Sequence, residues 1–147
     1  RGWKKMRELE RETFCFSAEG EIPMPGTQIT LRSIVLDCPD AWALAGFYSA
    51  LLGWDRHGEN TEWVSVGRMG TLPFLLFQEV EGYRPPVWPE KPGEQQKSVH
   101  LDFAVGDLAA AVALAEGLGA WKAPVQYDPG WTVMFDPAGH PFCLNQL

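Results

Sequence analysis

The amino-acid sequence predicts an α+β fold that uses one β-α-β-β-β module twice. The chain of 147 residues is 46% hydrophobic and 21% charged, which is usual for a globular protein. Its second half repeats its first, because Ile29 to Trp54 aligns without a gap with Gln96 to Trp121. Each half contains short β-branched and aromatic runs around one helical pattern. A repeated module is therefore the strongest organisational signal in the sequence.

The elements of the first half follow from local patterns. Leu31 to Cys38 is rich in β-branched and apolar residues and predicts a strand. Asp40 is suited to cap a helix, and Gly53 to end it in a left-handed conformation. Between them apolar residues recur at helical spacing, at Leu44, Phe47, Tyr48 and Leu51. Further strands are expected at Trp63 to Val66 and at Leu72 to Glu79.

The second half repeats this order. We expect a strand over Val99 to Val105, followed by a helix that Asp107 caps. The helical pattern consists of Ala111, Leu114, Ala115 and Leu118. Strands follow at Thr132 to Phe135 and at Pro141 to Asn145, joined by a hairpin turn at Asp136 to Gly139. Each half therefore has the same predicted element order.

Beyond the helices the repeat continues with a shift of one residue. Trp63 then aligns with Trp131, and Phe74 with Phe142. Because tryptophan is rare, matched Trp pairs support an internal duplication, and one loop insertion would explain the shift.

The domain boundaries follow from composition. Residues 1–26 combine charges of both signs with a stretch rich in Pro, Gly and Glu. We expect them to form a poorly ordered extension, with a regulatory or membrane-surface helix as the alternative. Residues 27–147 form the folded domain. It comprises module one at about 27–83, a linker at about 84–95 and module two at about 96–147.

Charge and motif content exclude several classes of function. The net charge is −7 and the pI is about 4.9, which argues against nucleic acid as a partner. No apolar run approaches the roughly 18 residues that a membrane span requires. The cysteines, Cys15, Cys38 and Cys143, form no C-x-x-C pair, which suits a reducing, cytoplasmic location. Phosphate-loop, dinucleotide-binding and serine-hydrolase motifs are absent from the sequence.

Three segments resemble the vicinal oxygen chelate superfamily, also called the glyoxalase/bleomycin-resistance/dioxygenase fold. They are Asp37 to Trp54 with its Leu-Leu-Gly-Trp end, Val99-His-Leu-Asp-Phe103, and Asp136 to Leu144. Phe77-Gln78 and Arg84 to Trp88 resemble its glyoxalase-like branch in particular. The resemblance implies that the two modules form a curved mixed or antiparallel sheet around a cleft, with the helices on the outer face.

In metal-using members of this superfamily, first and last strands supply four ligands, one pair per module. Carried over to this chain, the first-strand positions fall on Ser33 and His100, and the last-strand positions on Leu75 and Cys143. Serine is a poor ligand for a divalent cation and leucine is none. We therefore expect no metal cofactor. The alternative is a divalent metal ion held by His100 with Gln78, from a shifted strand register, or with Cys143.

Strand alternation assigns the candidate residues to one face of the sheet. Leu101, Phe103 and Val105 should pack under the helix, while His100 and Asp102 point to the opposite face, toward the cleft. In module one Ser33, Val35 and Asp37 take the cleft side by the same alternation. The carboxylates of Asp37 and Asp102 either make the cleft polar or accept hydrogen bonds from backbone amides at strand ends.

Other candidate residues each allow two interpretations. His100 is the candidate catalytic residue, as a general base or a ligand-orienting donor, or else it is structural. Cys143 is a nucleophile or, more simply, a small core residue. Trp88 in the linker binds ligand or anchors the linker. His57 and His140 lie in turn sequence and are expected to be solvated.

The leading hypothesis is a protein that binds a small organic molecule in a metal-free cleft, as a binding protein or a non-metal enzyme. The proposed lining residues are Ser33, Asp37, Gln78, Trp88, His100, Asp102 and Cys143. One alternative is a metal-dependent lyase or dioxygenase. Another is a resistance protein that sequesters a cationic drug through acidic and Trp side chains. The expected partner is a small molecule, with no nucleic acid and no membrane, and a homodimer could form.

Overall fold

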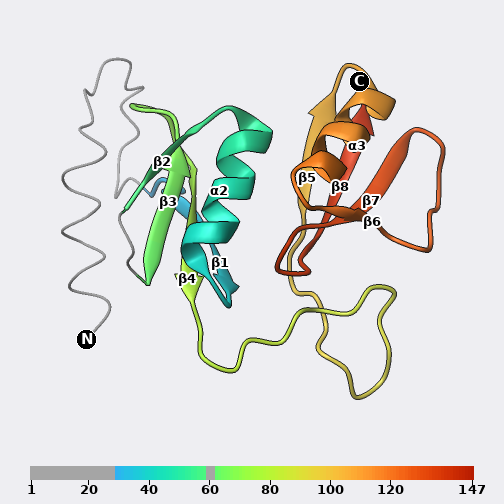
Figure 1. The fold of residues 1–147 in the computed structure, drawn as a ribbon, viewed down its shortest axis with the longest axis horizontal. Helices are drawn as coiled ribbons and strands as arrows, with labels where there is room; N and C mark the ends of the chain where they lie inside the picture. The colour runs from blue at the N-terminus through green and yellow to red at the C-terminus, as the bar shows by residue number, and fades with distance from the viewer. Residues whose placement is uncertain (1–28, 59–61) are drawn as a thin grey trace. The chain divides into compact units, whose positions relative to one another are not determined.

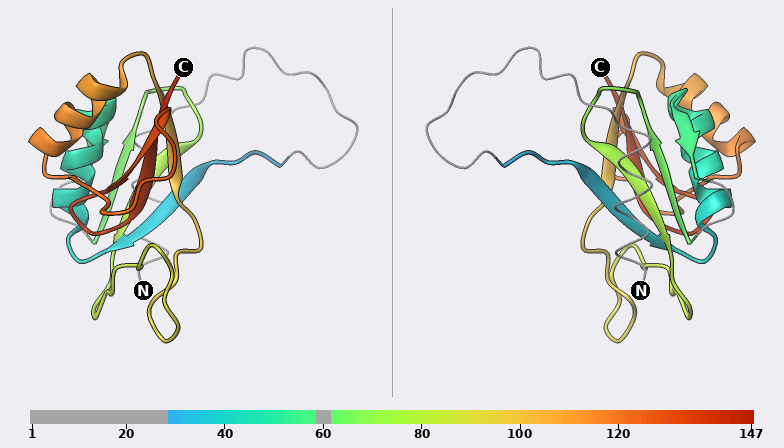
Figure 2. Two further views of the ribbon diagram at one scale, coloured as in Figure 1. Left: turned by 90° about the vertical axis from the view of Figure 1, so that its right-hand side faces the viewer. Right: turned by 90° about the vertical axis from the view of Figure 1, so that its left-hand side faces the viewer.

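The computed structural model describes residues 29–58 and 62–147. The chain divides into two compact units between Val80 and Glu81 (Figures 1 and 2). The predicted extension over residues 1–26 lies outside the described residues. Among the described residues, the helices are too short or too polar to cross a bilayer.

The first unit has the predicted β-α-β-β-β order. It consists of β1 (Ser33–Cys38), α2 (Ala41–Leu52), β2 (Asp55–His57), β3 (Trp63–Gly67) and β4 (Phe74–Glu79). The sheet order is β1-β4-β3-β2, in which β1 and β4 are parallel and the other pairs antiparallel. Helix α2 packs on one face of this mixed sheet (Figure 1).

The second unit repeats the same architecture. It consists of β5 (Leu101–Val105), α3 (Leu108–Gly117), β6 (Trp121–Lys122), β7 (Trp131–Phe135) and β8 (Pro141–Gln146). Its sheet order is β5-β8-β7-β6, again with the first pair parallel and the others antiparallel. The predicted α+β class and the two β-α-β-β-β modules are confirmed.

The helices begin where the sequence predicts. The Asp40 carboxylate accepts a hydrogen bond from the amide of Ala43 at 2.8 Å, and Asp107 does the same for Ala110 at 2.9 Å. These contacts satisfy amides of the first turn that have no partner within the helix. Gly53 ends α2 in the left-handed region at φ 62°, which glycine adopts without strain.

Each sheet has one face under its helix and one face opposite it. On the helix side Tyr48 stacks on Phe77 with 5.4 Å between ring centroids, and Phe103 meets Phe142 edge-on at 5.9 Å. The opposite face carries a second apolar cluster in each module. One contains Trp63, Phe74 and Leu76, and the other contains Ala123, Val133, Phe135 and Cys143. The predicted alternation along β5 is confirmed, because Asp102 is exposed between the partly buried Leu101 and Phe103.

The repeat alignment is wrong by one residue in the last strand. Ile34 lies opposite Leu75 in the first ladder, and Leu101 lies opposite Phe142 in the second. Phe142 therefore corresponds to Leu75, and Cys143 corresponds to Leu76 rather than to Leu75. The loop between β7 and β8 is one residue shorter than the loop between β3 and β4. This deletion cancels the one-residue insertion that lies between the helix and β7 of the second module.

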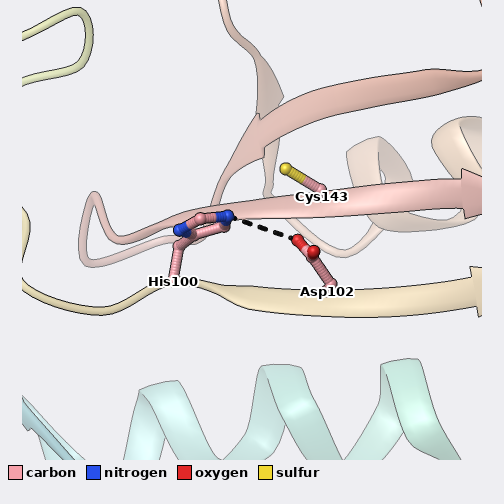
Figure 3. Close-up of side chains that lie close together, drawn as sticks. All are labelled: His100, Asp102 and Cys143. Atoms are coloured by element: carbon pink, nitrogen blue, oxygen red, sulfur yellow. Dashed lines mark ion pairs between the residues drawn. The ribbon is translucent and has the colours of Figure 1, made fainter.

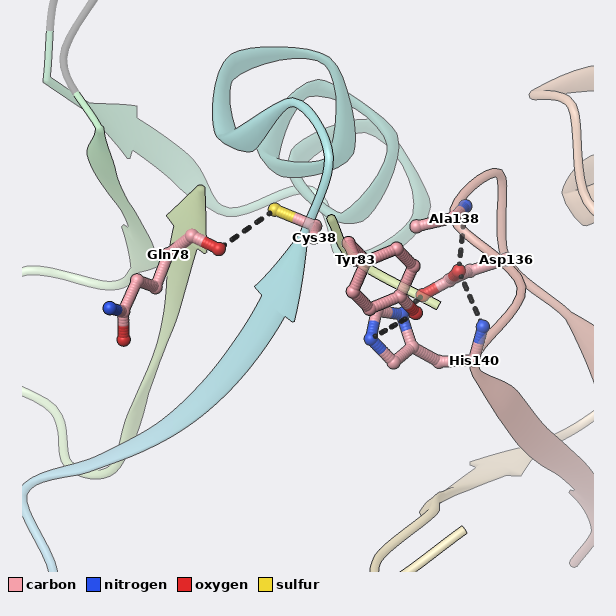
Figure 4. Close-up of polar contacts among 6 residues, drawn as sticks. All are labelled: Cys38, Gln78, Tyr83, Asp136, Ala138 and His140. Atoms are coloured by element: carbon pink, nitrogen blue, oxygen red, sulfur yellow. Dashed lines mark hydrogen bonds and ion pairs between the residues drawn. The ribbon is translucent and has the colours of Figure 1, made fainter. Parts of the chain in front are cut away.

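A buried network fixes the turn before β8. The fully buried Asp136 carboxylate accepts hydrogen bonds from the amides of Ala138 and His140, both at 2.9 Å. It also accepts from His140 Nδ1 at 2.8 Å, and Nε2 of the same ring forms a hydrogen bond with the Tyr83 hydroxyl at 3.0 Å (Figure 4). The His140 side chain is only 13% exposed, so the prediction of a solvated histidine is wrong.

Candidate functional site

Three polar side chains meet on the face of the second sheet opposite α3. His100 immediately precedes β5, Asp102 lies on β5, and Cys143 lies on β8 (Figure 3). Asp102 and Cys143 are partners in the parallel ladder, so their side chains share one face of the sheet. One donor atom from each of the three residues lies within 4.8 Å of the others.

Asp102 is the exposed centre of this group. Its side chain is 62% exposed, and its Oδ1 lies 3.4 Å from Nε2 of His100, which is 35% exposed. The Cys143 side chain is buried beneath it and hydrogen-bonds to the Asp102 carboxylate. A carboxylate has about four acceptor positions, so Asp102 keeps capacity for a further donor from solvent or a ligand.

The environment of Cys143 keeps its thiol protonated. Burial, which is the largest cause, acts together with the hydrogen bond to Asp102 and the negative charge of Asp102 to raise the pKa of this thiol from 9.0 to about 12. The thiolate is the nucleophilic form of cysteine. At neutral pH Cys143 is therefore a hydrogen-bond donor and core residue, which favours the second of its two predicted roles.

We expect iodoacetamide to alkylate Cys143 roughly a hundredfold or more slowly than a free thiol at pH 8, because little thiolate is present. Asp102→Asn should increase the rate, since it removes two of the three causes of the raised pKa while burial remains. Mass spectrometry of the Cys143 peptide measures the rate, and the buried Cys38 in the same sample controls for unfolding. Alkylation of Cys143 at the rate of an exposed thiol would contradict its buried, protonated state, and an unchanged rate in Asp102→Asn would contradict the contact with Asp102.

The sign of the pH effect on stability follows from the same shift. The folded state prefers the neutral thiol, so this contribution is complete below pH 9 and is lost as the pH rises toward about 12. The free energy of unfolding should fall in that window by up to about 1.4 kcal/mol per pH unit. Cys143→Ala should remove this slope, and urea denaturation at several pH values measures it.

Trp88 anchors the linker beside the three side chains. Its ring packs against the cluster that contains Val133 and Cys143, and it meets the His100 ring edge-on at 5.1 Å between centroids. Lys97 Nζ lies 4.2 Å from the centre of the Trp88 ring, and Lys97 also forms an ion pair with Glu90. The structure therefore brings Trp88, His100, Asp102 and Cys143 together within the second unit.

The other predicted site residues lie in the first unit. Asp37 on β1 is the ladder partner of Gln78 on β4, and both lie on the face opposite α2 without a bulge or register shift. Ser33 begins β1 opposite Phe74. The main-chain carbonyl of Gln78 accepts a hydrogen bond from the Cys38 thiol at 3.4 Å, while its side chain points away from Cys38 (Figure 4).

The donor set does not fit the metal site that the superfamily resemblance implies. His100, Asp102 and Cys143 offer nitrogen, oxygen and sulfur atoms in reach of one another. The counterparts of Asp102 and Cys143 in module one are Val35 and Leu76, which cannot bind a metal.

Sequence reasoning missed two aromatic residues near this group. Tyr127 lies before β7, and its hydroxyl accepts a hydrogen bond from Trp88 Nε1 at 3.1 Å. Trp131 begins β7, and its ring stacks on Tyr127 at 5.7 Å with 14° between the planes. Alternation along β7 could have placed Trp131 on the face of Val133 and Cys143. No sequence signal placed the loop residue Tyr127.

Comparisons with known proteins give one sequence family and many structural relatives. Residues 33–145 match the sequence model of a family described as a glyoxalase-like domain. The chain is similar in structure to a glyoxalase/bleomycin resistance protein/dioxygenase family enzyme from Burkholderia phytofirmans PsJN, with TM-score 0.60 and 18% identity, covering 80% of this chain and 98% of that one. No curated protein matches the chain in sequence.

Two further solved structures show the same likeness. A glyoxalase-related enzyme from Fulvimarina pelagi has TM-score 0.58 and 20% identity, covering 80% of this chain and 88% of that one. A glyoxalase family protein from Enterococcus faecalis has TM-score 0.53 and 22% identity, covering 84% of this chain and all of that one (100%). At these identities the likeness concerns the fold, and the fold hosts many activities.

Proposed function

This chain belongs to the glyoxalase-like domain family, and from that premise we propose that its second module binds a small organic cation at Asp102 without a metal ion. Membership confirms the resemblance to the glyoxalase-like branch of the vicinal oxygen chelate superfamily. The family itself does not specify a ligand, because activity in such folds depends on the site. The ligand class must therefore come from the side chains.

The observation that carries the proposal is the state of Asp102. Its side chain is 62% exposed, yet its carboxylate has two contacts, with His100 Nε2 at 3.4 Å and with the buried Cys143 thiol. A fixed acceptor loses little conformational freedom when a donor binds. An ammonium group supplies both the opposite charge and the hydrogen-bond donors that this carboxylate can accept.

The surroundings favour an organic cation over a hydrated inorganic one. The aromatic side chains of Trp88, Tyr127 and Trp131 lie in the same unit, and the first two are linked by a hydrogen bond. Aromatic and aliphatic surface attracts the carbon frame of a ligand, whereas hard cations prefer several oxygen ligands. The net charge of −7 also raises the local concentration of cations.

In this proposal His100 orients Asp102, and no proton transfer is needed for binding. The site would serve sequestration of a cationic compound as well as its conversion. Turnover of a bound compound, measured as product formed per protein, separates the two uses.

A titration of the full chain followed by NMR tests the proposal at low ionic strength. Butylammonium chloride should produce saturable shifts of the Trp88 indole N–H and the His100 amide, with an affinity in the millimolar range. The neutral 1-butanol has nearly the same shape and should leave these signals unchanged. Equal shifts with both compounds, or shifts confined to other residues, would contradict a cation site at Asp102.

A further inference from the structure

A second set of chemically reactive side chains lies at the turn before β8, and none of them belongs to the proposed cation site. Nδ1 of His140 lies 2.8 Å from the Asp136 carboxylate, and Nε2 of the same ring lies 3.0 Å from the Tyr83 hydroxyl (Figure 4). All three residues belong to the second unit. Carboxylate, imidazole and hydroxyl group therefore follow one another in the order found in sites that activate a hydroxyl group for attack.

The carboxylate fixes the orientation of the imidazole. Asp136 is fully buried, and its Oδ1 accepts from the amides of Ala138 and His140, while Oδ2 contacts Nδ1 of the ring. A neutral imidazole that donates through Nδ1 carries its lone pair on Nε2, the atom in contact with Tyr83. The buried negative charge also stabilises the imidazolium that forms when the ring takes up a proton.

The main chain holds Tyr83 beside this base. The Tyr83 and His140 rings lie 5.5 Å apart between centroids. Two residues further along, Pro85 packs so closely on Gly139 that a Cβ at residue 139 would lie 2.6 Å from the Pro85 Cβ. This contact ties the linker to the turn, so the hydroxyl group and the base are already in position. Tyr83 is partly exposed, and the His140 side chain is 13% exposed.

We propose that Tyr83 is an acceptor site for the acyl group of activated esters, with His140 as its general base and Asp136 as the residue that positions His140. The Tyr83 oxygen attacks the carbonyl carbon of the ester, and Nε2 of His140 takes the phenolic proton. The bond from the carbonyl carbon to the alcohol oxygen then breaks, and the departing oxygen receives the proton from His140. The products are an acyl ester of Tyr83 and the free alcohol.

Acetylation of the full chain by p-nitrophenyl acetate tests this site. Release of p-nitrophenol reports the total rate, and mass spectrometry of peptides locates the acetyl group. Tyr83 should react roughly tenfold or more faster than Tyr127, because a general base contributes about 10²–10⁴-fold and partial burial offsets some of this gain. Tyr127 is the internal control: it is 52% exposed, and its hydroxyl contacts the Trp88 indole, which cannot accept a proton.

Two variants separate base catalysis from a structural contact. Glutamine in His140→Gln can still accept a hydrogen bond from Tyr83 but cannot take its proton at neutral pH, so the Tyr83 rate should fall to about that of Tyr127. Tyr83→Phe should fold and lose only the acetylated Tyr83 peptide. The Tyr83 rate of the unmodified sequence should also be lower in D₂O, which a structural role would not cause. NMR spectra check the fold of each variant.

The comparison of Tyr83 with Tyr127 needs no variant, so it decides the question even if His140→Gln does not fold. Acetylation of Tyr127 as fast as that of Tyr83 would overturn the proposal and leave the three residues a purely structural network. An unchanged Tyr83 rate in folded His140→Gln would overturn it as well. Faster reaction at Tyr83 that depends on His140 would support it.

Discussion

Replacing Asp136 with alanine is expected to lower the free energy of unfolding by about 3–5 kcal/mol. The fully buried carboxylate accepts hydrogen bonds from two main-chain amides and from the His140 ring. Alanine would leave these donors without an acceptor in the protein interior. The loss should also release His140 from its contact with Tyr83. Urea denaturation of the full chain measures the change.

Two variants make this result specific. Asp136→Asn keeps one acceptor oxygen and should lose less stability than the alanine variant. Asp128→Ala removes an exposed carboxylate with a single bond to Gly130 and should cost less than about 1 kcal/mol. Equal losses for Asp136→Ala and Asp128→Ala would show that the buried network does not stabilise the turn.

Asp102→Asn is expected to weaken the binding of butylammonium about tenfold. The asparagine has nearly the same shape, but it removes the negative charge and replaces one acceptor with a donor. Hydrogen bonds to charged groups contribute about 1.5–3 kcal/mol, and the exposure of Asp102 places the effect near the lower end of that range. The NMR titration compares the dissociation constants of the two proteins.

Glu116→Gln is the matched control for this prediction. Glu116 is an exposed carboxylate on α3, on the other side of the same sheet. The substitution changes the net charge by the same amount, so it reports the effect of overall charge alone. An equal loss of affinity in both variants would mean that the cation responds to net charge rather than to Asp102.

Much of the fold could be predicted because its signals are local. The Asp40 and Asp107 caps and the alternation along β5 depend on a few adjacent residues. The sequence did not locate β2 and β6, although the module order requires a fourth strand in each half. Asp55–His57 and Trp121–Lys122 are too short to show an alternating pattern, and both are edge strands that their neighbours define.

The one-residue error in the last strand has a similar cause. Phe74 and Phe142 each follow a proline, and this matched sequence attracted the alignment. The strand pairing instead agrees with the burial pattern. Along both β4 and β8, four buried residues are followed by a partly buried one and an exposed one. A slip of one residue exchanges the two faces of a strand, so the error moved the counterpart of Cys143 from Leu76 to Leu75.

The candidate site was predictable where it depends on strand alternation. His100 and Asp102 follow from the pattern of β5, and the ladder then brings Cys143 to them. The buried network of Asp136, His140 and Tyr83 was missed because two of its members lie in turn sequence that usually faces solvent. Contacts made by loops depend on tertiary packing, which one sequence does not encode locally.

The central claim is that Asp102 binds an organic cation without a metal ion. The most direct test is a butylammonium titration of the protein before and after treatment with a chelator, with metal content measured by elemental analysis. We predict the same dissociation constant in both samples, with shifts at His100 and Trp88, whatever metal the purified protein contains. Binding that disappears with the metal and returns when Zn²⁺ is added would contradict the claim and make His100, Asp102 and Cys143 a metal site.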